Sequence, residues 1–277
     1  MGTALITGAT AGIGLELAWQ LAQAHHDLVL VARDRARLET VAEELRQFAG
    51  VGVQILPADL SEPGDLARVA ERARVSQPDA DLPIAVAADA GTVIASPAAS
   101  PTGPATAAGP AASPAVLPSD HLHTTAEVET RPIDLLVNNA GFAVGQDFVS
   151  GSIEQERRAL AVMVGAVMEL THAAVPGMVA RGHGAVLNVA SVTALTAMGT
   201  YAAHKAWVRT FTEGLASELR GTGVTATVLN PGLTHTEFHA RAAMDESAWP
   251  AFVWLQADDV ARQALDAVRR GQVICTP

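Results

Sequence analysis

Short apolar runs alternate with longer stretches of helical periodicity along most of the chain. The apolar runs are continuous, which is typical of strands that are covered on both faces of a parallel sheet. Strands are predicted at Thr3–Thr7, Asp27–Ala32, Val51–Pro57, Ile133–Asn138, Ala185–Ala190 and Val224–Leu229, and a last apolar run is Val273–Cys275. Helices are predicted at Leu15–Ala24, Arg35–Phe48, Glu62–Arg74, Ile153–Ala180, Tyr201–Arg220 and Ala257–Arg270. The pattern predicts an α/β fold with a doubly wound parallel sheet and helices on both faces.

One long segment, residues 75–130, breaks this pattern. It is rich in Ala, Pro, Ser and Thr, and six of the chain's fifteen prolines lie between Gly91 and Pro118. Such a composition is typical of a flexible insertion, with a partner-binding tether as the alternative. The segment precedes a strand, so it belongs to the amino edge of the sheet, whereas ligands of open α/β sheets bind at the carboxyl edge. We therefore expect a single domain over residues 1–277, interrupted by an insertion away from the chemistry.

Composition narrows the class of protein. Apolar residues make up 49% of the 277 residues, enough for a large core, and the net charge of −11 disfavours binding to nucleic acid or anionic membranes. The lone Cys275 excludes an internal disulfide and is consistent with a reducing compartment. The apolar stretch Ala159–Ala180 contains Glu169, His172 and Pro176, which favours a buried helix over a membrane span. These features predict a soluble, cytoplasmic protein.

A glycine cluster follows the first predicted strand. Residues Thr7 to Gly14 read Thr-Gly-Ala-Thr-Ala-Gly-Ile-Gly, and a helix follows at once. Glycines allow a tight turn and close backbone approach, and the helix N-terminus offers unpaired amides to a pyrophosphate. Glycines also serve ordinary turns, but the position between a first strand and a helix favours a dinucleotide site.

The end of the second strand bears on coenzyme choice. It reads Val31-Ala32-Arg33-Asp34, and the guanidinium of Arg33 suits the 2′-phosphate of NADP(H). Asp34 keeps NAD(H) open, and Arg33 could also be a simple surface residue. We expect NADP(H) to be preferred.

The ordered set of motifs resembles the short-chain dehydrogenases/reductases over almost the whole chain outside the insertion. The matching motifs are Thr7-Gly-X3-Gly-Ile-Gly14, Asp59-Leu60, Asn138-Asn-Ala-Gly141, Ser191, Tyr201-X3-Lys205 and Asn230-Pro-Gly232 followed by Thr236. The resemblance implies a Rossmann-type oxidoreductase and, around Arg33, an NADP-preferring carbonyl reductase. It implies coenzyme contacts from Gly8, Thr10, Gly12, Ile13, Gly14, Arg33, Asp59, Leu60, Asn138, Ala140, Gly141, Tyr201, Lys205, Pro231, Gly232, Thr234 and Thr236.

The expected chemistry centres on Tyr201 and Lys205, which lie four apart and so share one helix face. A phenol has an ordinary pKa near 10, and an ammonium held close to it lowers that pKa. Tyr201 would then exchange a proton with the oxygen of a carbonyl or alcohol while the coenzyme carries the hydride. Ser191 would hydrogen-bond the same oxygen and orient it. The alternative is that Tyr201 is a half-buried packing residue.

Two departures from the family bear on activity. Met163 stands where the family usually has an Asn that serves a proton relay, and a thioether is only a weak acceptor. Ser191 precedes Tyr201 by ten residues, about three fewer than usual, so Thr193 is the reserve candidate for its role. Both departures motivate a rival function, a weak or silent dinucleotide-binding protein that acts as a sensor or scaffold.

The substrate is expected to be a hydrophobic ketone, aldehyde or alcohol. Residues 233–255, which would close over it, contain Phe238, Trp249, Phe252 and Trp254, although lid packing or a subunit interface would also explain them. His235 and His239 are read as surface residues, and no metal is expected. The apolar helices predict a homo-oligomer, a dimer or a tetramer.

Overall fold

A seven-stranded parallel sheet forms the centre of the described structure. The computed structural model describes residues 2–75, 124–237, 250 and 253–277, and these fall within one compact unit, Met1–Leu82 with Leu122–Pro277. The strand order is β3-β2-β1-β4-β5-β6-β7. The strands are β1 (Thr3–Thr7), β2 (Asp27–Ala32), β3 (Val53–Pro57), β4 (Leu135–Asn138), β5 (Gly184–Val189), β6 (Val224–Leu229) and β7 (Ile274–Cys275). The predicted α/β, Rossmann-type fold is confirmed.

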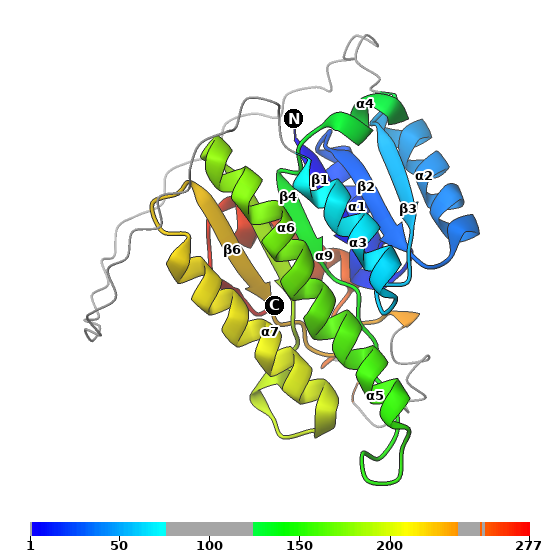
Figure 1. Ribbon diagram of the computed structural model, residues 1–277, viewed down its shortest axis with the longest axis vertical. Coiled ribbons are helices and arrows are strands. Elements are labelled where there is room, and N and C mark those ends of the chain that lie inside the picture. Colours follow the sequence, from blue (N-terminus) through cyan, green and yellow to red (C-terminus); the bar gives the residue numbers. More distant parts are fainter. Residues whose placement is uncertain (1, 76–123, 238–249, 251–252) are drawn as a thin grey trace. The chain divides into compact units, whose positions relative to one another are not determined.

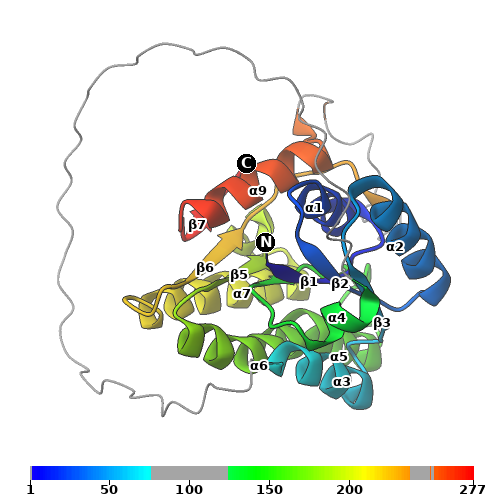
Figure 2. The same cartoon turned by 90° about the horizontal axis from the view of Figure 1, so that it is seen from above.

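Helices cover both faces of the sheet. They are α1 (Gly12–Gln23), α2 (Arg35–Ala49), α3 (Pro63–Arg74), α4 (Thr125–Thr130), α5 (Ile153–Leu160), α6 (Ala166–Arg181), α7 (Gly199–Glu218) and α9 (Ala257–Arg269). Seen from above, α1, α2 and α9 lie on one face and α3, α6 and α7 on the other (Figure 2). Both faces of the central strands are therefore buried, which explains their continuous apolar runs.

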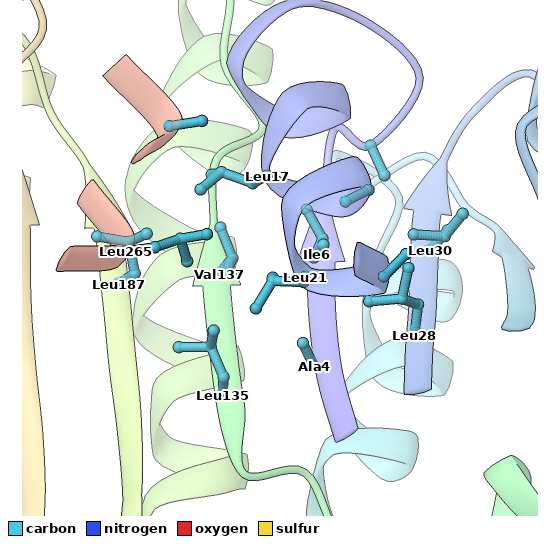
Figure 3. Packing of buried hydrophobic residues seen from close by; sticks show 14 of the residues in the cluster. Ala4, Ile6, Leu17, Leu21, Leu28, Leu30, Leu135, Val137, Leu187 and Leu265 are labelled. Atoms are coloured by element: carbon cyan, nitrogen blue, oxygen red, sulfur yellow. The ribbon is translucent and has the colours of Figure 1, made fainter. Parts of the chain in front are cut away.

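Each face has its own hydrophobic core. On the α1 side, Ile6 of β1 and Val137 of β4 pack with Leu17 and Leu21 of α1 and with Leu265 of α9 (Figure 3). On the opposite side, the alternate residues of the same strands pack against α3 and α6, as with Leu5 and Leu170. Because side chains alternate along a strand, one apolar run supplies both cores.

The predicted long helix is interrupted by a π-helical turn at Ala161–Gly165, which joins α5 to α6 (Figure 1). Single π turns are frequent at functional sites, and this one contains Met163. The whole stretch Ile153–Arg181 is long and apolar enough to pass for a membrane span, but half of its most apolar window is buried inside the protein. The other differences are small shifts of element ends and a 3₁₀ turn at Val192–Leu195.

Residues 76–123, most of the predicted insertion, lie outside the described residues. The last residues of the expected range form α4, which begins with a capping box of Thr124 and Glu127. On either side of the gap the chain is held at the amino edge of β3: Arg72 of α3 donates to Gln54 at 2.7 Å and to the carbonyl of Val128 at 2.6 Å. The described ends of the segment therefore lie at the amino edge of the sheet.

Candidate active site

The glycine turn after β1 has the shape of a backbone cradle. Gly8 and Gly12 have φ of 68° and 55°, a region that favours glycine. A Cβ on Gly14 would collide with the carbonyl oxygen of Gly8 and with Nδ2 of Asn139. Helix α1 begins at Gly12, three residues earlier than predicted, with no side-chain cap and no acidic residue in its first turn. Its first amides and positive dipole end fit a pyrophosphate, so the turn fits a dinucleotide.

The cradle is fastened to β4 by Thr7 and Asn139. The Thr7 hydroxyl accepts the amides of Asn139 and Ala140, both at 3.0 Å, and donates to the carbonyl of Val137. The Asn139 side chain donates back to the carbonyls of Thr7 and Gly8. We did not single out Thr7 and Asn139 as site residues from the sequence, although both belong to the quoted motifs.

The side chain of Asn138 is buried and hydrogen-bonded within the core. Its Nδ2 donates to Thr171 Oγ1 at 3.1 Å and to Asn188 Oδ1 at 2.9 Å, and Asn188 in turn donates to Thr212. All four side chains are buried, and they join β4, α6, β5 and α7. The Asn138 side chain therefore positions the strand ends beneath the site, and any contact with the coenzyme would come from its backbone.

The residues expected to hold the adenosine end of the coenzyme lie at the ends of β2 and β3. Arg33 is exposed, and in the part of the chain that the structure describes its guanidinium makes no hydrogen bond or ion pair. The Asp34 carboxylate caps α2 by accepting the amide of Arg37 at 3.1 Å, so it already has a structural role.

Asp59 is engaged by Ser61, whose hydroxyl donates at 2.6 Å, and by Arg158 of α5 at 2.5 Å. Burial pushes the pKa of Asp59 upward, but the hydrogen bonds from Ser61 and the charge of Arg158 outweigh it and lower the pKa below its usual value. Leu60, beside it, is buried in the core. Asp59 is therefore an ionised carboxylate, and its partner Arg158 was not predicted from the sequence.

Ser191, Tyr201 and Lys205 meet at the carboxyl end of β5. Ser191 follows the strand and is hydrogen-bonded to Tyr201 despite the short spacing between them. Lys205 is 4% exposed, and its Nζ donates to the carbonyl of Val189 at 2.7 Å. That Nζ lies 5.8 Å from the centre of the Tyr201 ring. The compact turn Val192–Leu195 brings Ser191 close to Tyr201 despite the short spacing. Ser191, rather than Thr193, is the residue whose hydroxyl reaches Tyr201.

The electrostatics of this trio differ from the expectation. Burial raises the pKa of Tyr201 to about 12, and the hydrogen bond with Ser191 only partly opposes this. Burial also lowers the pKa of Lys205 to about 8. In the protein alone the cost of burying a phenolate therefore exceeds the hydrogen bond from Ser191, and the pKa of Tyr201 is not lowered. The expected lowering by Lys205 together with the positive nicotinamide of the oxidised coenzyme stays a prediction. Tyr201 is a neutral proton donor in this state.

Met163 and Gly141 line the other side of Lys205. A Cβ built on Gly141 would lie 3.3 Å from Nζ of Lys205 and 3.5 Å from Sδ of Met163. Met163 is 1% exposed, so a thioether fills the place where the family usually has an amide. A Cβ at Gly141 would make an ordinary contact with Met163 and a tight one with the ammonium of Lys205.

The segment that follows β6, residues 230–237, lies next to the glycine turn. The carbonyl of Pro231 accepts the amide of Val192 at 3.0 Å, and the hydroxyl of Thr234 donates to the carbonyl of Gly232. A Cβ on Gly12 would lie 3.0 Å from Cβ of Thr236. Of the remaining predicted coenzyme residues, Thr10 and Ile13 are partly exposed at the turn. Phe238, His239, Trp249 and Phe252 lie outside the described residues.

Two polar residues near the trio, the buried Glu156 and the partly exposed His204, were missed by the sequence analysis. Glu156 of α5 is 8% exposed and accepts a hydrogen bond from Gln146 at 3.2 Å. His204 precedes Lys205; burial lowers its pKa, the charge of Glu156 opposes this, and the charge of Lys205 adds to it. Only the three-dimensional packing of α5 against α7 brings these residues together. Elsewhere in the described ranges, no three His, Cys, Asp or Glu side chains gather as metal ligands would.

Comparison with known proteins identifies the family. The model of the short chain dehydrogenase family matches residues 2–97 and 119–247. The chain belongs to the short-chain dehydrogenases. It is therefore an oxidoreductase of the NAD(P)-dependent kind, as the motifs implied.

Individual relatives are consistent with this assignment. A short-chain dehydrogenase from Sphingobium yanoikuyae, solved with NADPH, is 31% identical, with a TM-score of 0.76 over 100% of this chain and 88% of that one. The bulky-bulky ketone specific alcohol dehydrogenase from Comamonas testosteroni is 25% identical, with a TM-score of 0.73 over 100% and 86%. The NADP-dependent 3-hydroxy acid dehydrogenase of Salmonella typhi is 28% identical over 84% of this chain and 73% of its own length.

Proposed function

We propose that this short-chain dehydrogenase is an NADP(H)-dependent carbonyl reductase for hydrophobic ketones and aldehydes, reversible toward the alcohols. The observation that carries the proposal is the closure of Ser191 and Tyr201 over a buried Lys205, beside the glycine cradle. Ser191, Tyr201 and Lys205 are the proposed catalytic residues. A weak or silent sensor remains the rival, motivated by Met163.

NADP(H) is preferred because Arg33 is the available cation at the adenosine end. Its exposed guanidinium can take a 2′-phosphate in a bidentate contact. Asp34, the residue that left NAD(H) open, is engaged as the cap of α2. The NADPH complex of the Sphingobium yanoikuyae protein supports the same choice.

In the proposed mechanism the protein positions the substrate oxygen and handles its proton. When bound, the nicotinamide would supply hydride to the carbonyl carbon, or accept it in the reverse direction. The Tyr201 hydroxyl, which is protonated in the protein alone, donates its proton to the carbonyl oxygen as hydride arrives. Ser191 donates a hydrogen bond to the same oxygen. Lys205, held by Val189, stabilises the phenolate that remains.

The loops that follow β4 and β5, which would form the substrate wall, expose large apolar side chains. Leu195 and Met198, between Ser191 and Tyr201, are 70% and 64% exposed, and Phe148 in the loop after β4 is 63% exposed. Large apolar side chains that stay exposed around a reacting group are typical of a surface that binds an apolar ligand. A hydrophobic carbonyl compound fits this wall better than a charged sugar phosphate.

The coenzyme part of the proposal is tested by Arg33→Ala. Dissociation constants for NADPH and NADH are measured by fluorescence for both proteins. We expect the substitution to weaken NADPH binding about tenfold or more, through loss of a charge-assisted contact, and to leave NADH binding nearly unchanged. A wild type that binds NADH more tightly than NADPH, with a preference that Arg33→Ala leaves unchanged, would show an NAD enzyme.

A further inference from the structure

An ion pair joins the adenosine end of the site to the segment that follows β6. Arg37 stands in the first turn of α2, and Glu237 is the last described residue before the gap at 238–249. Nη2 of Arg37 lies 2.8 Å from Oε1 of Glu237, and Nη1 lies 3.3 Å from Oε2. The contact is bidentate, the fork geometry with which a guanidinium also holds a phosphate.

The surroundings of this pair place it at the coenzyme. The amide of Arg37 is bonded to Asp34, the residue that follows Arg33. Thr236, which precedes Glu237, packs on the glycine turn at Gly12. The pair therefore connects the first turn of α2 to the glycine turn. The Glu237 carboxylate binds the guanidinium of Arg37, which lies four residues after Arg33 in the chain.

The two arginines in the first turn of α2 have different acidic partners. Arg35 pairs with Glu39 of its own helix at 3.7 Å, whereas Arg37 pairs with Glu237 of the segment that follows β6. Both side chains of the second pair are nearly half exposed, at 45% and 47%. Exposed ion pairs contribute little to stability, so a stronger anion can replace Glu237 on Arg37 at little cost.

Resting on the NADP(H) assignment above, we propose that Glu237 is a specificity-determining residue that competes with the coenzyme's 2′-phosphate for Arg37. Binding of NADP(H) exchanges the carboxylate for the phosphate on this guanidinium. NAD(H) lacks that phosphate and leaves the pair intact. Glu237 thus lowers the affinity for NADP(H) selectively, and Arg37 is the second cation of the phosphate site after Arg33.

The test uses ligands that isolate the adenosine end and needs no turnover. Affinities for adenosine 2′,5′-bisphosphate and for 5′-AMP are measured by calorimetry at physiological salt, on the wild type, Glu237→Gln, Arg37→Gln and the double variant. Glu237→Gln is expected to bind the bisphosphate about threefold tighter, a change on the scale of an exposed ion pair. Arg37→Gln is expected to bind it about tenfold more weakly. In the double variant, Glu237→Gln has no further effect on bisphosphate affinity, and the affinity for 5′-AMP stays unchanged in all four proteins.

Glu39→Gln is the matched control, because it also removes one carboxylate charge but releases Arg35, a neighbouring arginine of the same helix, instead of Arg37. It is expected to change neither affinity by more than about twofold, since exposed charges away from the ligand are screened. The inference is overturned if Glu237→Gln leaves the affinity for the bisphosphate unchanged. It is also overturned if the substitution lowers the affinities for both ligands equally, as expected of a residue that only stabilises the structure. Failure of the NADP(H) assignment is distinct: Arg33→Ala would then leave bisphosphate binding unaltered.

Discussion

At the scale of single residues, burial shifts the pKa values of two catalytic candidates. Tyr201 and Lys205 are shifted toward their neutral forms, with pKa values of about 12 and about 8. The sequence could predict that the two side chains share a helix face. It could not predict that Lys205 donates to Val189, because that contact depends on how α7 packs against β5.

The buried ammonium should lower the stability of the protein. A drop in the pKa of Lys205 from 10.5 to about 8 corresponds to about 3 kcal/mol against the charged form in the folded state. Below about pH 8 this penalty is fully present, and it disappears as the pH rises toward the pKa of the unfolded chain. Lys205→Met is therefore expected to raise the free energy of unfolding at pH 7 by about 2 kcal/mol, after loss of the bond to Val189.

Urea unfolding at pH 7 and near pH 10 checks this prediction. The gain in Lys205→Met should shrink at the higher pH, because the wild-type lysine is then neutral in the folded state. A variant that is less stable than the wild type at both pH values would refute the account of Lys205.

At the scale of elements, the hydrophobic pattern located the strands and most helices, since both depend on local periodicity. The π turn at Ala161–Gly165 was not predictable, because it adds one residue to a helix without changing its apolar character. The helix α4 was missed because its six residues bury only Val128. The glycine turn was recognised from its spacing, whereas its fastening by Asn139 to β1 required the structure.

The glycine turn gives a sharp prediction for Gly14→Ala. The new methyl group would collide with the carbonyl of Gly8 and with Asn139, which Thr7 holds in place. Overpacking of this kind costs about 1–3 kcal/mol of stability, and it should also weaken NADPH binding by distorting the cradle.

Gly64→Ala serves as the control, because nothing lies within 4 Å of a Cβ at that position in α3. Thermal unfolding and NADPH titration of both variants decide the matter. If Gly14→Ala behaves like Gly64→Ala, the cradle is less tightly built than we describe.

At the scale of the whole molecule, α5 and α6 expose large apolar side chains, and the neighbouring helix α7 has an apolar hollow. Leu160 and Met168 are 49% and 48% exposed, and the outer side of α7 has a hollow lined by Trp207, Thr210, Phe211, Gly214, Leu215 and Glu218. Figure 1 shows α6 and α7 adjacent on one face of the sheet. We expect a homodimer in which this surface meets its own copy about a twofold axis.

Sedimentation velocity at about 10 μM, a concentration at which specific homodimers persist, tests the dimer. Met168→Asp should shift the wild-type dimer to a monomer while the circular dichroism spectrum stays the same. Val273→Asp, at an apolar position exposed elsewhere on the protein, should remain dimeric. A wild-type monomer would exclude this interface.

The central claim is that Tyr201 carries the proton in an NADPH-dependent carbonyl reduction. Its most direct test is the rate of NADPH oxidation with a panel of hydrophobic ketones and aldehydes, for the wild type and Tyr201→Phe together. The account predicts turnover by the wild type, a loss of kcat of about a hundredfold or more in the variant, and the same affinity for NADPH in both. Equal rates in the two proteins would contradict the role of Tyr201. No turnover by a wild type that still binds NADPH would favour the silent sensor.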